Sequence, residues 1–219
     1  MNSNGTVEAK IVETKNICLN KDGKIVYKNG TVEVLKYGLT KIKEAAYKGN
    51  KDIVRVVLPD DVISIGRQAF CDCSYISEFE MPGSVERIDD EAFAGCIGLS
   101  KITISESIGI IKEKAFFVCL GLTDIIIPHG VRIIKESAFS NCESLESITI
   151  PKSLESIESK AFYKCGKLAD IYYCGSEAEW KWINIAKEGN EKLIGNMFKH
   201  AKIHYNSAFD AAKQGKERT

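Results

Sequence analysis

The chain has 219 residues, of which 44% are apolar, and its 30 basic and 30 acidic side chains give a formal net charge of zero. This length is enough to bury a hydrophobic core without disulfide or metal staples, and the zero net charge gives no electrostatic reason to expect binding to nucleic acid or to an anionic membrane. No apolar run approaches the roughly 18 residues that span a bilayer, and residues 1–20 lack the apolar core of a signal peptide, so we expect neither membrane insertion nor a recognisable leader.

Residues 1–35 are predicted to form an antiparallel β cap. The dipeptides Asp22-Gly23 and Asn29-Gly30 favour hairpin turns, and they separate three β-rich runs at 17–19, 25–27 and 32–35. Such a cover is needed because the region that follows is built from repeats, and its first copy would otherwise leave an open core.

A period of 23 residues governs residues 36–173. An Ala-Phe pair recurs with this step and is followed three residues after the phenylalanine by a cysteine column: Cys73, Cys96, Cys119, Cys142 and Cys165. An isoleucine column runs from Ile65 to Ile157, and the four prolines of the chain share one further column, in which Ser105 is the exception.

One repeat, residues 82–104, reads PGSVERIDDEAFAGCIGLSKITI. Its end alternates and is rich in β-branched residues, which predicts a short strand with Leu99, Ile102 and Ile104 facing inward. Residues 89–93 are too few for a stable helix and are interpreted as one helical turn. Because a single repeat cannot close its own core, the copies must stack, with their strands paired in parallel as a β-solenoid.

The combined pattern L-x-x-I-x-I-P-x-x-V-x-x-I-x-x-x-A-F-x-x-C resembles the BspA-like subtype of bacterial leucine-rich repeats. The match covers about residues 39–173, with Tyr47 and Asn50 replacing phenylalanine and cysteine in a divergent first copy. The resemblance implies an α/β-type repeat fold: a right-handed leucine-rich-repeat solenoid with a parallel β-sheet on one face and short helical turns opposite. We expect Asn50 to hydrogen-bond the turn backbone.

Residues 174–207 are predicted to form a helix-containing C-terminal cap, and residues 208–219 a polar tail, so that residues 1–219 form one repeat domain. The segment Ser176-Glu-Ala-Glu179 is a capping box, after which Trp180 and Ile183 fall on one helix face and could cover the last repeat. Alternatively, Trp180 and Trp182 form a platform on which a carbohydrate stacks.

The eight cysteines raise the question of redox or metal chemistry. Parallel side chains in one column keep their Cβ atoms slightly too far apart for disulfides, so we expect buried free thiols. Cys71 and Cys73 lack a facing pair with zinc-ligand spacing, whereas Cys18 and Cys174 are the candidates for accessible thiols. His200 and His204 have no acidic third ligand beside them in sequence, so we expect no metal, no cofactor and no enzymatic activity.

The outward side of the parallel sheet is then the expected working surface. Its two columns consist of Arg55, Glu78, Lys101, Asp124, Ser147 and Asp170, and of Val57, Glu80, Thr103, Ile126, Thr149 and Tyr172. Charges alternate in sign along the start of the first column, which favours strand register and solubility. The second column contains the exposed apolar contact candidates Val57, Ile126 and Tyr172.

These observations predict a non-enzymatic protein-binding module, with a carbohydrate-binding or structural module as the alternative. The resemblance implies a secreted or cell-surface bacterial protein for adhesion, with a host or extracellular-matrix protein as partner. The lack of a recognisable signal peptide or anchor leaves a cytoplasmic location open. Twelve face residues are fewer than the about 20–30 of a standard interface, so we expect weak contacts and a monomer or weak oligomer.

Overall fold

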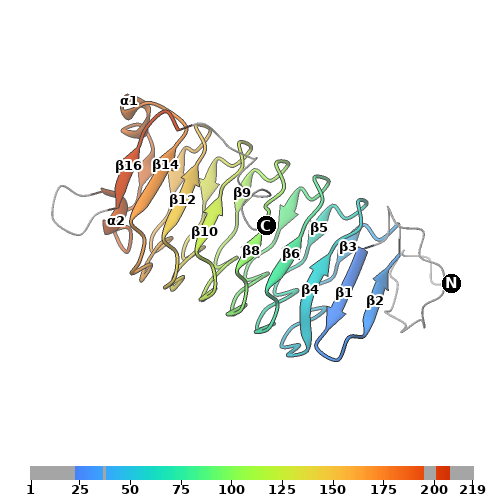
Figure 1. Ribbon diagram of the computed structural model, residues 1–219. Helices are drawn as coiled ribbons and strands as arrows, with labels where there is room; N and C mark the ends of the chain where they lie inside the picture. Colours follow the sequence, from blue (N-terminus) through green and yellow to red (C-terminus); the bar gives the residue numbers. More distant parts are fainter. Residues whose placement is uncertain (1–22, 37, 195–200, 208–219) are drawn as a thin grey trace.

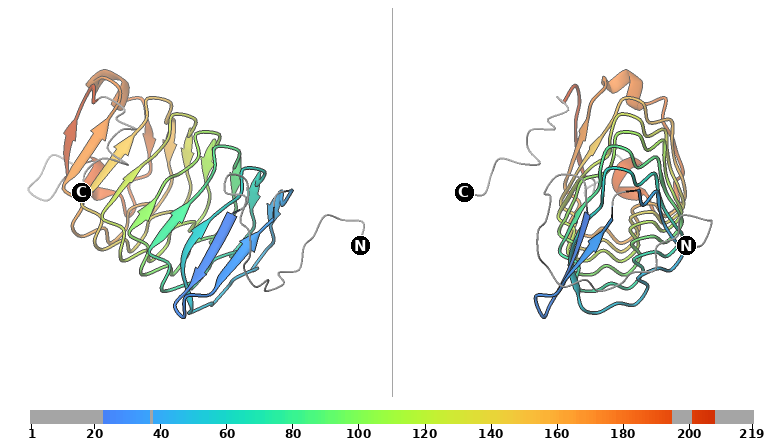
Figure 2. Two further views of the ribbon diagram at one scale, coloured as in Figure 1. Left: turned by 45° about the vertical axis from the view of Figure 1, so that its right-hand side comes forward. Right: turned by 90° about the vertical axis from the view of Figure 1, so that its right-hand side faces the viewer.

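The computed structural model describes residues 23–36, 38–194 and 201–207. The chain winds into successive coils of 23 residues that stack along one axis, from β2 at the N-terminal end to β16 at the C-terminal end (Figure 1). Viewed along that axis, the coils superimpose as a tube with two flattened walls (Figure 2, right). This arrangement is the predicted parallel-strand solenoid.

The first wall is a sheet in two parts. Its strands, in order along the axis, are β2 (Val32–Leu35), β1 (Gly23–Tyr27), β4 (Ile53–Val57), β6 (Glu78–Glu80) and β8 (Lys101–Ile102), followed by β10 (Asp124–Ile126), β12 (Ser147–Ile150), β14 (Asp170–Tyr173) and β16 (Lys202–His204). From β4 onward the pairs are parallel and shifted by one coil, so that Val56 lies beside Phe79 and Phe79 beside Ile102.

The second wall is a ladder of two-residue strands that the sequence analysis did not predict as a sheet. It contains β3 (Lys41–Ile42), β5 (Ser64–Ile65) and β7 (Arg87–Ile88), and then β9 (Ile110–Ile111), β11 (Ile133–Ile134), β13 (Ser156–Ile157) and β15 (Asn184–Ile185). The isoleucine column supplies the buried residue of each strand from β5 to β13.

The predicted helical turn in each repeat is wrong. Residues 89–93 and their equivalents form consecutive turns, because Glu91 and Gly95 have left-handed φ values of 57° and 72° that a helix does not allow. Alternate amides then bond to the next coil instead of to their own, and the Phe93 N–H donates to the Ala115 carbonyl at 2.9 Å. The turns therefore form a third hydrogen-bonded ladder along the solenoid.

The core consists of like residues stacked in columns. The phenylalanine rings of successive coils lie 5.3–5.7 Å apart with interplanar angles of 1–7°, and Tyr47 continues the stack 5.2 Å from Phe70. Each column cysteine is buried and free, as predicted, and donates its thiol hydrogen to the carbonyl of the aromatic residue one coil earlier at 3.0–3.3 Å. The columns thus join neighbouring coils through side chains as well as through backbone.

Both walls are interrupted at the same boundary, between the coils formed by residues 82–104 and 105–127. No strand pairing joins β8 to β10 or β7 to β9 in the described chain. The turn ladder and the stacked rings of Phe93 and Phe116 continue across this boundary, and the hydroxyls of Ser105 and Ser107 both donate to the Gly83 carbonyl.

The N-terminal end is covered by the antiparallel pair of β1 and β2, and β1 pairs antiparallel with β4. The predicted runs 25–27 and 32–35 form these two strands, whereas the run 17–19 lies outside the described residues. The buried Glu33 carboxylate accepts hydrogen bonds from Tyr27 Oη at 2.6 Å and Tyr47 Oη at 3.2 Å. Burial and these contacts raise the pKa of both tyrosines, so both remain hydrogen-bond donors.

Asn50 takes the cysteine position in the first coil. Its Oδ1 accepts from the backbone N–H groups of Asp52 at 2.9 Å and Ile53 at 3.1 Å. The predicted bond from this side chain to the turn backbone is therefore confirmed.

At the C-terminal end the predicted capping box is present. Ser176 and Glu179 bond each other's backbone at the start of α1 (Glu177–Trp180), and Trp180 is buried edge-to-face against Tyr173 at 5.1 Å. Ile183 is also buried, although it lies beyond the end of α1. A second short helix, α2 (Glu191–Ile194), follows β15.

Asn190 closes the turn ladder beyond the last 23-residue coil. Its side chain is fully buried, accepts from the Phe162 N–H at 3.1 Å, and donates to the Glu158 and Ala186 carbonyls at 2.8 Å each. One amide side chain thus replaces the backbone partners that the next coil supplies elsewhere.

Replacing Asn190 with alanine should lower the free energy of unfolding by about 1–3 kcal/mol, because buried backbone groups lose their partners. Urea denaturation measures this change. Asn184→Ala, at an exposed position on β15, is the matched control and should change stability little. Equal losses in both variants would show that Asn190 has no special role.

Candidate functional site

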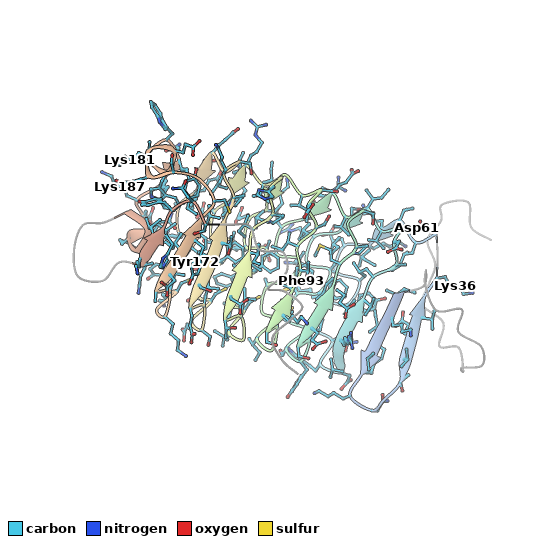
Figure 3. The ribbon with its side chains drawn as sticks, turned by 45° about the horizontal axis from the view of Figure 1, so that its top comes forward. Lys36, Asp61, Phe93, Tyr172, Lys181 and Lys187 are labelled. Carbon is cyan, nitrogen blue, oxygen red and sulfur yellow. The ribbon has the colours of Figure 1, made fainter. Side chains whose placement is uncertain are left out.

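The structure places the twelve predicted residues in two parallel columns on the outward side of the first sheet. They alternate with buried residues such as Val56, Phe79 and Ile125. Tyr172 is exposed, with 38% of its surface accessible, whereas Val57 and Ile126 are half-buried rather than fully exposed as predicted. Figure 3 shows Tyr172 on this face, over β14.

The N-terminal half of this face is dominated by paired charge. Arg55 bonds Glu80 and lies 3.5 Å from Glu78, and the hydrogen bond with Glu80 raises the pKa of Arg55. Within the first column, the predicted alternation thus yields one ion pair in the described chain, between Arg55 and Glu78. Lys101 and Asp124 form no ion pair in the described chain, since they lie on opposite sides of the interruption between β8 and β10.

The C-terminal half carries fewer charges and includes a cluster that sequence reasoning missed. Strand β16 pairs with β14, which places Lys202 beside Asp170 and His204 beside Tyr172. His204 Nε2 lies 2.7 Å from Asp170 Oδ1, and its ring stacks on Tyr172 with centroids 4.7 Å apart. The alternation in residues 201–205 indicates a strand, but Ile203 follows Ile171 by 32 residues instead of 23, so the period does not reveal the pairing.

The aromatic residues of the C-terminal region do not form a paired stacking platform. Trp180 is buried against Tyr173, whereas Trp182 is 87% exposed, so the predicted pairing of the two indoles on one surface is wrong. One face of Tyr172 is covered by His204, and Thr149 lies beside it in register on the other side. A sugar ring therefore has only Trp182 as a freely accessible aromatic surface among these residues.

The thiols are unsuited to nucleophilic chemistry. Burial raises the pKa of Cys71 and of Cys73 to about 11 and that of Cys165 to about 12. Burial also raises the pKa of the half-buried Cys174, whereas Cys18 lies outside the described residues. A thiolate would need the opposite shift.

Metal-binding clusters are equally absent from the described chain, where no three His, Cys, Asp or Glu side chains could hold an ion together. Of the two histidines considered in the sequence, His200 lies outside the described residues. His204 instead finds its acidic neighbour in Asp170, which is 34 residues away in sequence and adjacent only through the strand pairing.

Alkylation of the native protein at pH 8 should leave the column cysteines unmodified. At a pKa of about 11, only about one thiol in a thousand at Cys71 is ionised at this pH, and the fraction rises about tenfold for each pH unit. Mass spectrometry after iodoacetamide treatment, with a urea-unfolded sample as control, measures the labelling. Rapid native labelling of Cys71 or of the column would contradict the buried arrangement.

The fold defines this protein as a leucine-rich-repeat solenoid with parallel strands on both walls. The family model for the BspA type leucine rich repeat region matches residues 40–169 in six copies. The chain therefore belongs to the BspA-type leucine-rich-repeat family, as the sequence pattern predicts. No curated protein matches it.

Solved structures of bacterial proteins share the fold. A leucine rich repeat protein from T. pallidum is 29% identical, with a TM-score of 0.59 over 63% of this chain and 63% of that one. A leucine-rich repeat protein from Bacteroides ovatus is 33% identical, with a TM-score of 0.59 over 68% and 37% of the two chains. A leucine rich cell surface protein from Faecalibacterium prausnitzii is 27% identical, with a TM-score of 0.52 over 68% and 55%. The present chain spans less than two thirds of the length of each.

Within residues 23–36, 38–194 and 201–207, no helix is both long enough and apolar enough to cross a membrane.

Proposed function

We propose that this protein is a non-enzymatic binding module that contacts a protein partner through the outward face of its first sheet. The observation that carries the proposal is the half-exposed apolar and hydroxyl surface on β10, β12 and β14, where Ile126, Thr149 and Tyr172 lie in register. The leucine-rich-repeat fold is generally a non-enzymatic scaffold, and the unreactive environment of the thiols supports the same function.

The size of the face supports a more substantial contact than the sequence alone suggests. Strands β1, β2 and β16 extend the two columns beyond the predicted six strands, so that nine strands with two outward residues each form one surface. Eighteen residues approach the about 20–30 per side of a standard protein interface. The charged N-terminal half would contribute orientation more than affinity, since exposed ion pairs contribute little free energy.

A secreted or cell-surface location is part of this proposal. It is supported by the family and by the solved structure from Faecalibacterium prausnitzii that is described as a cell surface protein. A protein displayed in this way would meet host or extracellular-matrix proteins, which are the partners we propose for an adhesive role. The carbohydrate-binding alternative has weaker support, because Trp180 is buried and Trp182 stands alone.

Placing a charge at Ile126 should weaken partner binding by at least about fivefold, because a desolvated contact at the centre of an interface contributes more than about 1 kcal/mol. Binding of the wild-type chain and of Ile126→Glu to immobilised fibronectin, laminin and collagen can be compared by biolayer interferometry. Ile133→Glu is the matched control, since Ile133 is equally half-buried but lies on the second wall.

Circular dichroism of both variants should show the wild-type fold, because neither side chain belongs to the buried core. Full affinity of the Ile126→Glu variant would move the contact site away from this face. An equal loss in both variants would point to a general effect of added negative charge.

A further inference from the structure

The zero net charge conceals a separation of charge along the solenoid. Residues 23–51 contain seven lysines, two glutamates and no arginine, whereas the other described residues contain 23 acidic and 16 basic side chains. The lysines of this first layer are Lys24, Lys28, Lys36, Lys41, Lys43, Lys48 and Lys51. Residues 23–51 therefore carry an excess of five positive charges, whereas the rest of the described chain is acidic.

None of these seven lysines forms an ion pair with a carboxylate in the described chain. Lys28 lies 3.0 Å over the ring of Tyr75, Lys48 donates to the Gln68 amide at 2.8 Å, and Lys51 donates to the Asp72 carbonyl at 2.7 Å. Lysines of the later coils are neutralised more often, for example those paired with a glutamate at 2.5–2.9 Å: Lys114, Lys135, Lys152, Lys160 and Lys181.

The two glutamates of the first layer do not cancel this charge. Glu33 is buried between the hydroxyls of Tyr27 and Tyr47, and Glu44 is exposed without a basic partner in the described chain. The acidic residues of the next coil lie about 4.8 Å further along the axis, apart from Asp61, whose carboxylate reaches back to accept from the Gly38 N–H at 2.7 Å.

The lysines encircle the end of the tube instead of gathering on one flank. Lys24 is on the first wall, Lys41 on the second wall and Lys48 in the turn ladder, while Lys28 is at the tip of the β1–β2 hairpin. Lys36 lies at the end of β2, at the N-terminal end of the molecule (Figure 3). The ammonium groups of Lys28, Lys48 and Lys51 contact residues of the following coils. Lys36, Lys41 and Lys43 are exposed and have no partner in the described chain, so they are the side chains that a flat surface facing this end would contact.

We propose that this basic end, defined by the seven lysines of residues 23–51, docks end-on against an anionic lipid bilayer. Lysine is a flexible point charge that adapts to mobile headgroups, and juxtamembrane basic residues are attracted to such surfaces without insertion. Nucleic acid is disfavoured because the layer lacks arginine forks, and because Tyr27 and Tyr47 are held by Glu33 instead of being free to stack on bases.

Docking in this orientation places the acidic body away from the membrane, and the charge separation orients the solenoid with its axis along the bilayer normal. The outward face of the first sheet then stands perpendicular to the membrane and remains accessible along its length. The proposal does not rest on the protein-binding function: Lys24 on β1 belongs to both surfaces, but Lys36, Lys41 and Lys43 lie outside the strands of the first sheet.

The test is cosedimentation of the full chain with vesicles of phosphatidylcholine that contain about one third phosphatidylglycerol, compared with phosphatidylcholine alone. We expect salt-sensitive binding to the anionic vesicles only. The triple variant K36Q/K41Q/K43Q should bind about a hundredfold more weakly, since each lysine near the surface contributes about a fivefold change in affinity. These three exposed side chains have no partner in the described chain, so the variant should keep its fold.

The control K167Q/K187Q/K202Q removes the same charge from exposed lysines near the other end, which also lack carboxylate partners in the described chain. It should bind the anionic vesicles within about twofold of the unmodified protein if its charges lie beyond a Debye length from the surface. Equal weakening in both triple variants, or no binding of the unmodified chain, would overturn the proposal. Binding to double-stranded DNA as tight as that to the vesicles at the same salt concentration would also overturn it.

Discussion

The structure depends on the in-register stacking of identical side chains at a fixed step of one coil. The five stacked aromatic pairs from Tyr47 to Phe162 each add about 0.5–1.5 kcal/mol beyond their burial, and each column thiol bonds the carbonyl of the preceding coil. Because both contacts require the same axial spacing as parallel strands, side chains and backbone impose one register. Even where both walls lose their strand pairing, between residues 82–104 and 105–127, the stacked rings and the turn ladder keep the coils aligned.

The same constraint determines where function can reside. Inward positions are filled by apolar side chains, so the working surfaces are the outward columns and the two ends. Ion pairs such as Arg55 with Glu80 and Arg132 with Glu155 satisfy much of the charge on the walls. The side wall near Ile126 and the lysine-rich first layer differ from this background, one by its low charge and the other by its unpaired charge, and they suit different kinds of partner.

Periodicity predicted the parts of the fold that repeat. The inward columns, the buried thiols and the parallel sheet follow from a 23-residue step, and the capping box at Ser176 follows from a local motif. The features that the sequence did not predict depend on backbone geometry, or on contacts that do not recur every 23 residues. The left-handed φ at Glu91 turns an expected helical turn into a ladder, and the 32-residue spacing conceals the pairing of β16. Asn190 acquires its role because its amide replaces the backbone partners of a regular coil. For the candidate face, sequence predicted the two columns but not the stacking of His204 on Tyr172.

The most direct test of the register is the deletion of one whole period. Removing residues 128–150 joins Ile127 to Pro151 and brings each aromatic and thiol back over its own column, so we predict a shorter protein with a cooperative thermal unfolding transition. Removing residues 128–149 shifts every later column by one position, which exchanges inward and outward side chains in the strands. We predict loss of the cooperative transition in that variant. If both deletion variants unfold cooperatively, or if neither does, the 23-residue register is not what holds the coils together.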